Sequence, residues 1–203
     1  MLGETKRDRR TERRTATRRE IVDAAWQVAR DKGLAQVTLR DVAELVGMRA
    51  PSLYTHFASK NAIYDAMFGD AWAQFLDYSK AVQVDEPPDS RAALRFYARV
   101  FFDFAIAFPA RHQLMNLRTI PDFAPSPEAY APSVAMMQDF VARMTRQGIH
   151  EQDDIDLFVA IVSGMVDAQL ANDPGGARWS RLLDRAIDMY ADNVGIIDER
   201  SGS

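Results

Sequence analysis

The chain has 203 residues, of which 47% are hydrophobic, so it can bury a sizeable core and is not disordered throughout. It contains no cysteine, which excludes disulfides, thiolate catalysis and cysteine-ligated zinc. The net charge of −4 is unevenly spread, since residues 1–60 carry a balance of +5 and the rest of the chain a balance of −9. A basic segment ahead of an acidic body suggests a polyanionic partner for the N-terminal part alone.

The N-terminal segment is the most basic part of the chain. Its first nineteen residues hold eight Lys and Arg against three Asp and Glu. Residues 1–14 are predicted to form a disordered basic arm, for which the alternative is a solvated tail without a partner. No apolar stretch of signal-peptide length follows, and the apolar run at 104–108 is too short to span a bilayer. We therefore predict a cytoplasmic protein that does not associate with a membrane.

Residues 15–60 are predicted to form a domain of three helices. Apolar residues at helical spacing indicate the first helix, which ends at Gly33. Thr38 and Asp41 form the capping pattern of a short second helix, and Gly47 ends it.

A third helix begins after Arg49. Pro51 lies in its first turn, where the missing N–H has no intrahelical partner. Leu53 and Phe57, one turn apart, pack this helix against the first two. Arg49 stands where a Ser or Asp cap would be more favourable by about 1 kcal/mol. A residue that departs in this way from the usual preference for a helix cap indicates a function.

Residues 61–195 are predicted to form a second domain, built of six further helices. The first two of these helices are expected to begin near Ser59 and near Asp89 or Ser90. The next two are expected at 113–117 and 133–147. The fifth should begin near Asp153 or Asp154 and end before Pro174, and the last should include Trp179 to Tyr190. Residues 196–203 are predicted to be a disordered tail. No period-2 strand pattern persists, so we expect an all-α fold of about nine helices.

Two short helices joined by Val46-Gly47-Met48 form a helix-turn-helix, whose second helix enters the major groove of DNA. Small, uncharged residues at the start of that helix let its backbone come close to base edges. Ala50, the Pro51 ring and the Thr55 methyl can contact thymine methyls, and Ser52 can hydrogen-bond several bases. The shape alone also occurs in bundles that do not bind DNA.

The stretch TLRDVAELVGMRAPSLYTHFASK, from Thr38 to Lys60, resembles the DNA-binding signature of the TetR family of transcriptional regulators. Its most specific part is the block Leu53-Tyr54-x-His56-Phe57-x-x-Lys60. The resemblance covers residues 15–65 by motif and the later helices by number and order. It implies a ligand-responsive regulator, and we expect a repressor that a small apolar effector releases from a palindromic operator on double-stranded DNA.

The resemblance also assigns roles to residues of the motif. Thr38 and Tyr54 would meet phosphates, Arg40 would reach a base, and Lys60 would neutralise a phosphate. Arg49 replaces the Ser of many family members and would contact a base or a phosphate. The expected DNA-binding residues are Thr38, Arg40, Arg49, Ala50, Pro51, Ser52, Tyr54, Thr55, His56 and Lys60.

In the family, the body of the protein dimerises and binds the effector. The helix that begins near Asp153 is apolar nearly all round, more than one protomer's bundle would bury, so a homodimer is expected. The expected interface residues are Phe158, Val162, Val166, Trp179, Leu183 and Tyr190. The alternative is that these side chains fill an internal core.

Met and aromatic side chains form adaptable apolar pockets, which makes them candidates for the effector site. The expected ligand-binding residues are Trp72, Phe75, Phe101, Phe104, Met115, Met136, Met137 and Phe140. The polar candidates near them in sequence are Asn116, Arg118, Gln138 and Gln169. At helical spacing the same apolar residues can equally be plain core.

Catalysis finds little support in the sequence. The three histidines lie far apart without a metal-ligand spacing, and there is neither a nucleophile elbow nor a phosphate-binding glycine loop. We therefore predict no catalytic residue, metal or cofactor. Two other functional classes are left open: an all-α enzyme with a vestigial DNA-binding module, and a nucleoid-type protein that binds DNA regardless of sequence. The acidic body argues against the second.

Overall fold

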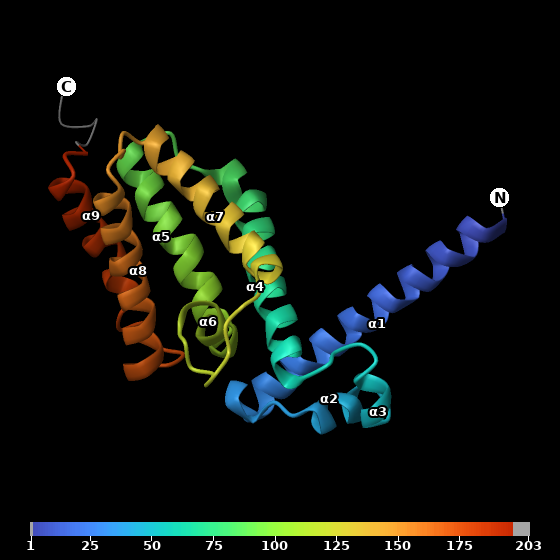
Figure 1. Ribbon diagram of the computed structural model, residues 1–203. Coiled ribbons are helices and arrows are strands. Elements are labelled where there is room, and N and C mark those ends of the chain that lie inside the picture. The colour runs from blue at the N-terminus through green and yellow to red at the C-terminus, as the bar shows by residue number, and fades with distance from the viewer. Residues whose placement is uncertain (1, 197–203) are drawn as a thin grey trace. The chain divides into compact units, whose positions relative to one another are not determined.

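The computed structural model describes residues 2–196, with side chains from residue 9 onward. In this range the chain forms nine α-helices and three short 3-10 helices (Figure 1), which confirms the predicted all-α fold. The α-helices are α1 (Leu2–Lys32), α2 (Leu39–Leu45), α3 (Ala50–Leu53), α4 (Lys60–Val82), α5 (Ser90–Ala107), α6 (Pro109–Asn116), α7 (Pro127–Arg146), α8 (Gln152–Asn172) and α9 (Leu183–Asn193). The 3-10 helices are η1 (Leu34–Gln36), η2 (Gln83–Asp85) and η3 (Ser180–Leu182). The predicted disordered tail falls, apart from Ile196, outside the described residues.

The chain divides into two compact units. Unit 1 comprises Met1–Ala71 and Ala110–Ala131, and unit 2 comprises Trp72–Pro109 and Pro132–Ser203. The first half of α4 and the segment 110–131 thus belong with the helix-turn-helix, although the sequence places a boundary at residue 60. Periodicity along the chain could not show this grouping, because it depends on contacts between segments far apart in sequence.

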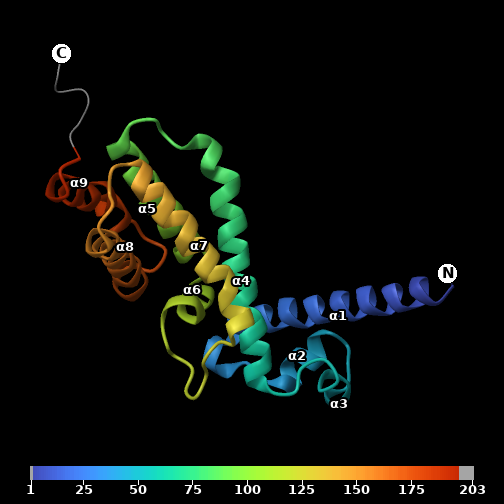
Figure 2. The ribbon, with the colours of Figure 1, turned by 45° about the horizontal axis from the view of Figure 1, so that its top comes forward.

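The first helix is longer than the sequence indicates. α1 begins at Leu2, so residues 2–14 are helical where a disordered arm is predicted. This segment lacks proline and is rich in Arg, Lys and Glu, which are good helix formers. Figures 1 and 2 show the N-terminal half of α1 projecting beyond α2 and α3. The basic residues of the N-terminus are therefore part of a helix, α1.

The turn between α2 and α3 has a well-defined cause. Gly47 adopts φ 69°, a conformation that favours glycine. Its N–H bonds the Glu44 carbonyl at 3.1 Å, and the N–H of Met48 bonds the Ala43 carbonyl at 2.8 Å. This pair of bonds is a Schellman motif, which ends α2 and directs the chain into α3.

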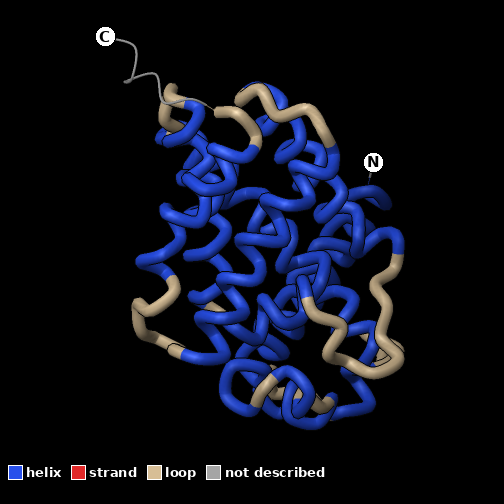
Figure 3. Tube along the Cα trace, turned by 90° about the vertical axis from the view of Figure 1, so that its left-hand side faces the viewer, coloured by secondary structure: helices blue, strands red, loops and turns tan. Residues whose placement is uncertain are grey.

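Two helices begin earlier than predicted, each with a proline as its first residue. α6 begins at Pro109 and α7 at Pro127, whereas the sequence suggests 113 and 133. Proline is tolerated in the first helical turn, so these residues start helices that the sequence pattern treats as broken. Figure 3 shows the described chain as helices and loops, and no strand is found in it.

The core of unit 2 is formed where α5 packs against α8 and α9 (Figure 2). α8 contributes one apolar stripe to it, including Ile155, Phe158 and Val162, and α9 contributes Leu183 and Ile187. Side chains at spacings of three and four residues share one face of a helix, so each helix turns a single face inward. The other face of α8 is free of these contacts.

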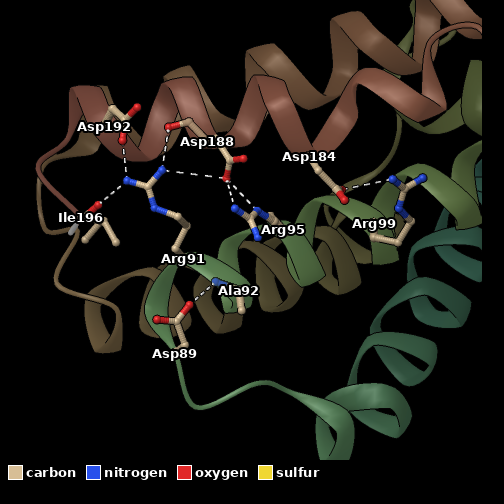
Figure 4. A network of polar contacts seen from close by, with 9 residues as sticks. All are labelled: Asp89, Arg91, Ala92, Arg95, Arg99, Asp184, Asp188, Asp192 and Ile196. Atoms are coloured by element: carbon tan, nitrogen blue, oxygen red, sulfur yellow. Dashed lines mark hydrogen bonds and ion pairs between the residues drawn. The ribbon is translucent and has the colours of Figure 1, made fainter. Parts of the chain in front are cut away.

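A ladder of ion pairs fixes α9 against α5 (Figure 4). Three arginines at four-residue intervals on α5 face three aspartates at four-residue intervals on α9. From one end of the ladder to the other, the arginines are Arg91, Arg95 and Arg99, and their partners are Asp192, Asp188 and Asp184. The reversed order of the partners shows that the two helices run antiparallel.

Arg91 is the buried end of this ladder. Besides Asp192, it donates hydrogen bonds to the carbonyl oxygens of Ile196 at 2.7 Å and Asp188 at 3.4 Å. A buried guanidinium needs several acceptors to offset the loss of water, and here the end of α9 supplies them. Arg99, at the other end, is partly exposed and pairs with Asp184 at 3.2 Å.

Candidate nucleic-acid interface

The third helix has one buried and one exposed side. Leu53 and Phe57 are buried in the core of unit 1, as predicted. Pro51 and Ser52 are exposed, Ala50 is half-buried, and the Tyr54 side chain is 53% exposed. The segment therefore presents a small, uncharged surface to solvent, and its two large apolar residues anchor it.

α3 is short, but its hydrogen bonding continues for another turn. After Leu53, the N–H groups of His56 and Phe57 both bond the Leu53 carbonyl, at 2.9 and 3.0 Å. The Thr55 hydroxyl donates to the Ser52 carbonyl at 2.7 Å. Its proton is thus held by the helix backbone, while the exposed Thr55 side chain keeps an acceptor and a methyl group for an outside partner.

Arg40 on α2 and Arg49 at the start of α3 are exposed cations. Among the described residues neither makes a hydrogen bond or an ion pair. Arg49 has the extended backbone of an N-cap residue, with φ −76° and ψ 142°, yet its side chain caps nothing. Both guanidinium groups are therefore available to acceptors outside the chain.

Thr38 has a structural role in α2. Its hydroxyl oxygen accepts the Asp41 N–H at 3.1 Å, and its proton is donated to the Asp41 carboxylate at 2.6 Å. Lys32 donates to the same carboxylate at 2.8 Å. The hydrogen bonds from Lys32 and Thr38 hold the pKa of Asp41 below its usual value. The predicted contact of Thr38 with a phosphate would have to share a hydroxyl that already caps α2.

Lys60 is not the free cation that the motif suggests. Its ammonium donates to the Ala35 carbonyl in η1 at 3.1 Å and lies 5.3 Å from the centre of the Tyr64 ring. Tyr64, one turn further along α4, donates to the Leu34 carbonyl at 2.8 Å. Lys60 and Tyr64 thus attach α4 to the segment that precedes α2. The Lys60 ammonium is kept there by its hydrogen bond to the Ala35 carbonyl.

His56 and Arg18 form a contact that the sequence did not reveal. His56 is one of the expected DNA-binding residues, but it is half-buried, and its Nδ1 has no hydrogen-bond partner among the described residues. Its carbonyl accepts a hydrogen bond from Arg18 of α1, whose guanidinium lies 4.0 Å from the centre of the Phe57 ring. Arg18 therefore fixes the end of the recognition segment against α1. No periodicity distinguishes it from the other arginines of the N-terminus.

The predicted ligand-binding residues do not form one site. Trp72, Phe75, Phe101 and Phe104 gather in unit 2, with Phe75 at the centre of the cluster and ring centroids 4.9–6.2 Å from it. These rings pack against one another. Burial of Phe75 at 5% exposure is the mark of a core residue.

The remaining four candidates for the ligand site lie elsewhere. Phe140 contacts the rings of Tyr97 and Phe158 in the core of unit 2. Met136 is buried and Met137 is exposed, so the two lie on different sides of α7. Met115 belongs to unit 1, where it lines a pocket.

The predicted dimer-interface residues require a correction. Five of them are buried inside the protomer and one is half-buried. The buried ones are Phe158, Val162, Val166, Leu183 and Tyr190, and Trp179 is half-buried. The five buried residues belong to the internal core that the sequence left as the alternative. For those on α8, which is apolar on nearly every side, the pattern does not show which side faces inward.

The exposed residues of α8 and α9 include apolar side chains. On α8 the outward face carries Leu157, which is 42% exposed, together with Ala160 and Gly164. On α9 the Met189 side chain is 65% exposed. At Gly164 an added Cβ would meet nothing within 4 Å. Small residues on this face leave room for a second helix to approach closely.

Two other features of the described residues bear on function. No helix in them is long and apolar enough to cross a bilayer. No three His, Asp or Glu side chains among them gather where they could hold a metal ion.

Comparison with known proteins identifies the helix-turn-helix segment. Residues 21–67 match the family of bacterial regulatory proteins described as the tetR family. Over 62 residues the chain is 34% identical to tetracycline repressor protein class D of Escherichia coli, a match that covers 30% of this chain and 28% of that one. Over 79 residues it is 30% identical to the HTH-type transcriptional regulator TtgR of Pseudomonas putida, covering 39% of this chain and 38% of that one. The chain thus matches well under half the length of these curated relatives.

Solved structures share the fold over most of the chain. A protein with unknown function from a Rhodococcus species superposes with a TM-score of 0.74 at 18% identity, covering 87% of this chain and 94% of that one. The TetR family transcriptional regulator PfmR from Thermus thermophilus gives a TM-score of 0.57 at 22% identity, covering 84% and 96%. At these identities the likeness concerns the fold.

Proposed function

We propose that the protein is a homodimeric repressor of the TetR family that a small effector releases from a palindromic operator, and the match of residues 21–67 to this family supports the proposal. The matching family is one of regulatory proteins, so we propose a transcription factor and not an enzyme. A protein with this role works in the compartment that holds the operator DNA.

The exposed tip of α3 carries this proposal. Pro51, Ser52 and Thr55 present methyl, ring and hydroxyl groups of the kind that read base edges in the major groove. Arg49 directly precedes this tip and Arg40 lies on α2, and neither makes a hydrogen bond or an ion pair among the described residues. A neutral surface accompanied by exposed cations is suited to a groove between two phosphate backbones.

Dimerisation is proposed from the outward face of α8 and α9. One such module contacts few base pairs, and two modules on half-sites about 34–36 Å apart read a longer sequence. The exposed Leu157, Gly164 and Met189 lie on this face, so the symmetry-related copy would meet it there and leave the buried stripe of α8 inside each protomer.

Selection of bound fragments from the host genome tests the proposal. We expect a palindromic sequence to be enriched and a labelled fragment to bind with a strong dependence on salt. Thr55→Ala should weaken binding to this fragment by about 1–3 kcal/mol and relax the preference at one position of each half-site. Recovery of fragments without a common sequence would indicate binding that is indifferent to sequence and would overturn the proposal.

Thr145→Ala is the matched control. The Thr145 hydroxyl donates to the Val141 carbonyl at 2.9 Å, much as Thr55 donates to Ser52, but it lies on α7 in unit 2. Loss of the same type of hydrogen bond at this position should leave the affinity for the fragment unchanged.

A further inference from the structure

Unit 1 contains a pocket that the predicted ligand-binding set touches only at Met115. The pocket has a volume of ≈ 250 Å³, and all of its lining residues belong to unit 1. Its wall comes from Phe68 of α4, the end of α6, the connection 117–125 and Tyr130 of α7. Drug-sized ligands occupy pockets of about 300–1,000 Å³, so this one suits a smaller molecule.

The lining of the pocket combines aromatic and aliphatic side chains with the polar Asn116 and one charged residue. The rings of Phe68 and Tyr130 are stacked with centroids 5.7 Å apart, and Phe123 adds a third ring to the wall. Among the lining residues Arg118 alone is charged, and among the described residues it makes no hydrogen bond or ion pair. Guanidinium groups pair with carboxylates in a bidentate geometry. A ligand with a flat apolar body and one carboxylate would match both features.

The connection that forms one wall is bonded to the first turns of α4. Asn61 donates to the Asp122 carbonyl at 3.3 Å. Asp65 accepts the N–H of Ser126 at 2.6 Å and its hydroxyl at 2.8 Å. These hydrogen bonds connect this wall of the pocket to the first turns of α4.

The same turns of α4 are attached to the segment before α2. Lys60 and Tyr64 donate to the carbonyl oxygens of Ala35 and Leu34 in η1. The Tyr64 ring also lies 5.8 Å from that of Phe123, which lines the pocket. One stretch of helix thus contacts both the pocket wall and η1, the segment that precedes the helix-turn-helix.

We propose that this pocket is a binding site for a small aromatic monocarboxylate, held by Arg118, and that its occupancy changes operator affinity through the first turns of α4. The effect on operator affinity rests on the proposed function, whereas binding of the carboxylate does not. The site lies in the same unit as the helix-turn-helix and is separate from the aromatic cluster of unit 2.

Calorimetric titration of the full chain without DNA tests the binding step. The probes are 1-naphthoate and its neutral counterpart 1-naphthamide. We expect the carboxylate to bind at least tenfold more tightly than the amide, and Arg118→Gln to remove this preference while the amide binds as before. Arg181→Gln, an exposed arginine of unit 2, is the control and should change neither affinity. Equal affinities for the two probes, or a preference that survives in Arg118→Gln, would overturn the proposal.

A second variant tests the location independently of charge. Ala124 is exposed and lines the pocket, so Ala124→Trp should fill the pocket without disturbing a buried residue. We expect it to abolish binding of both probes while the circular dichroism spectrum and the melting temperature stay as in the wild type. Undiminished binding of 1-naphthoate to a folded Ala124→Trp protein would place the ligand elsewhere.

Fluorescence polarisation with the selected operator fragment tests the coupling. Saturating 1-naphthoate should change operator affinity at least tenfold, a coupling of about 1.4 kcal/mol. Asp65→Ala should reduce this change, because it releases the connection from α4, while Asp77→Ala on an exposed position of the same helix should not. An unchanged operator affinity with ligand bound would overturn the coupling. If no operator is found at all, the proposed function fails, and the calorimetric result alone decides whether the pocket binds a carboxylate.

Discussion

The α5–α9 pair of unit 2 and the helix-turn-helix of unit 1 both carry arginines, but they use them in opposite ways. Each arginine of the ladder on α5 has an aspartate of α9 as its partner. Arg40 and Arg49 have none among the described residues. Charges paired inside the chain fix how two helices lie against each other, whereas unpaired cations beside a neutral helix tip are left for a polyanion.

The two faces of α8 provide the test with the largest expected effect. Val162 is 2% exposed, so Val162→Arg places a charge without a partner in the core of unit 2. We expect it to reduce the free energy of unfolding by about 4 kcal/mol or more, enough to prevent folding. Circular dichroism and urea unfolding measure the loss.

Met189→Arg is the counterpart on the outward face. Because Met189 is 65% exposed, this variant should fold normally yet sediment as a monomer in analytical ultracentrifugation. Its operator affinity should fall with the loss of the second half-site contact. A Val162→Arg protein that folds as a stable monomer would restore the interface predicted from the sequence, and a dimeric Met189→Arg protein would remove the one proposed from the structure.

The ladder itself can be broken at either end. Arg91→Met removes a buried guanidinium that serves Asp192 and two carbonyl oxygens, and it should cost about 2 kcal/mol of stability. Arg99→Met, at the partly exposed end, should cost less than about 1 kcal/mol. Equilibrium unfolding in urea compares the two. Equal losses would mean that burial does not set the strength of these pairs.

The sequence predicted well what depends on neighbours along the chain. The Thr38 cap, the turn at Gly47 and the buried pair Leu53 and Phe57 are set within one or two turns, and all three are present in the structure. Each is fixed by local hydrogen bonds or by a helical repeat of three to four residues. The helix-turn-helix can therefore be recognised from the residue pattern alone.

What the sequence could not show depends on distant contacts. Lys60 sits in the most specific block of the motif, yet its ammonium is bound to Ala35, 25 residues away. The start of α4 holds the connection after α6 through Asn61 and Asp65, whose partners are 61 residues away in each case. The inward side of α8 was undetermined for the same reason, since a helix that is apolar all round has no periodicity to indicate its buried face.

Lysine and arginine at the DNA face should therefore differ in their effects. Arg49→Ala should weaken operator binding by about 1–3 kcal/mol, because the exposed guanidinium is free to contact a base or a phosphate. Lys60→Met should leave the salt dependence of binding unchanged, because its ammonium is already bound within the chain. Polarisation titrations over a range of salt concentrations measure both. A reduced salt slope for Lys60→Met would show that Lys60 leaves Ala35 to bind a phosphate.

A modest effect is expected at the polar cluster around Tyr97 in unit 2. The Tyr97 hydroxyl donates to the Glu86 carboxylate at 2.6 Å, and Gln147 donates to the Tyr97 oxygen at 3.2 Å. Burial, followed by the contact with Glu86, raises the pKa of Tyr97 to about 12. At pH 8 the loss of these bonds in Tyr97→Phe should cost about 1 kcal/mol.

The pH dependence of that difference has a definite sign. Above about pH 10 the unfolded chain loses the tyrosine proton while the folded chain keeps it, so the stabilisation from Tyr97 is complete below pH 10 and declines as the pH rises toward about 12. The advantage of the wild type over Tyr97→Phe in urea unfolding should therefore shrink between about pH 10 and about pH 11.5. If the difference in unfolding free energy between the wild type and Tyr97→Phe stays constant across this range, the fold does not hold Tyr97 in its neutral form. The contact with Glu86 would then stabilise the protein no more than a polar contact on the exposed surface of unit 1.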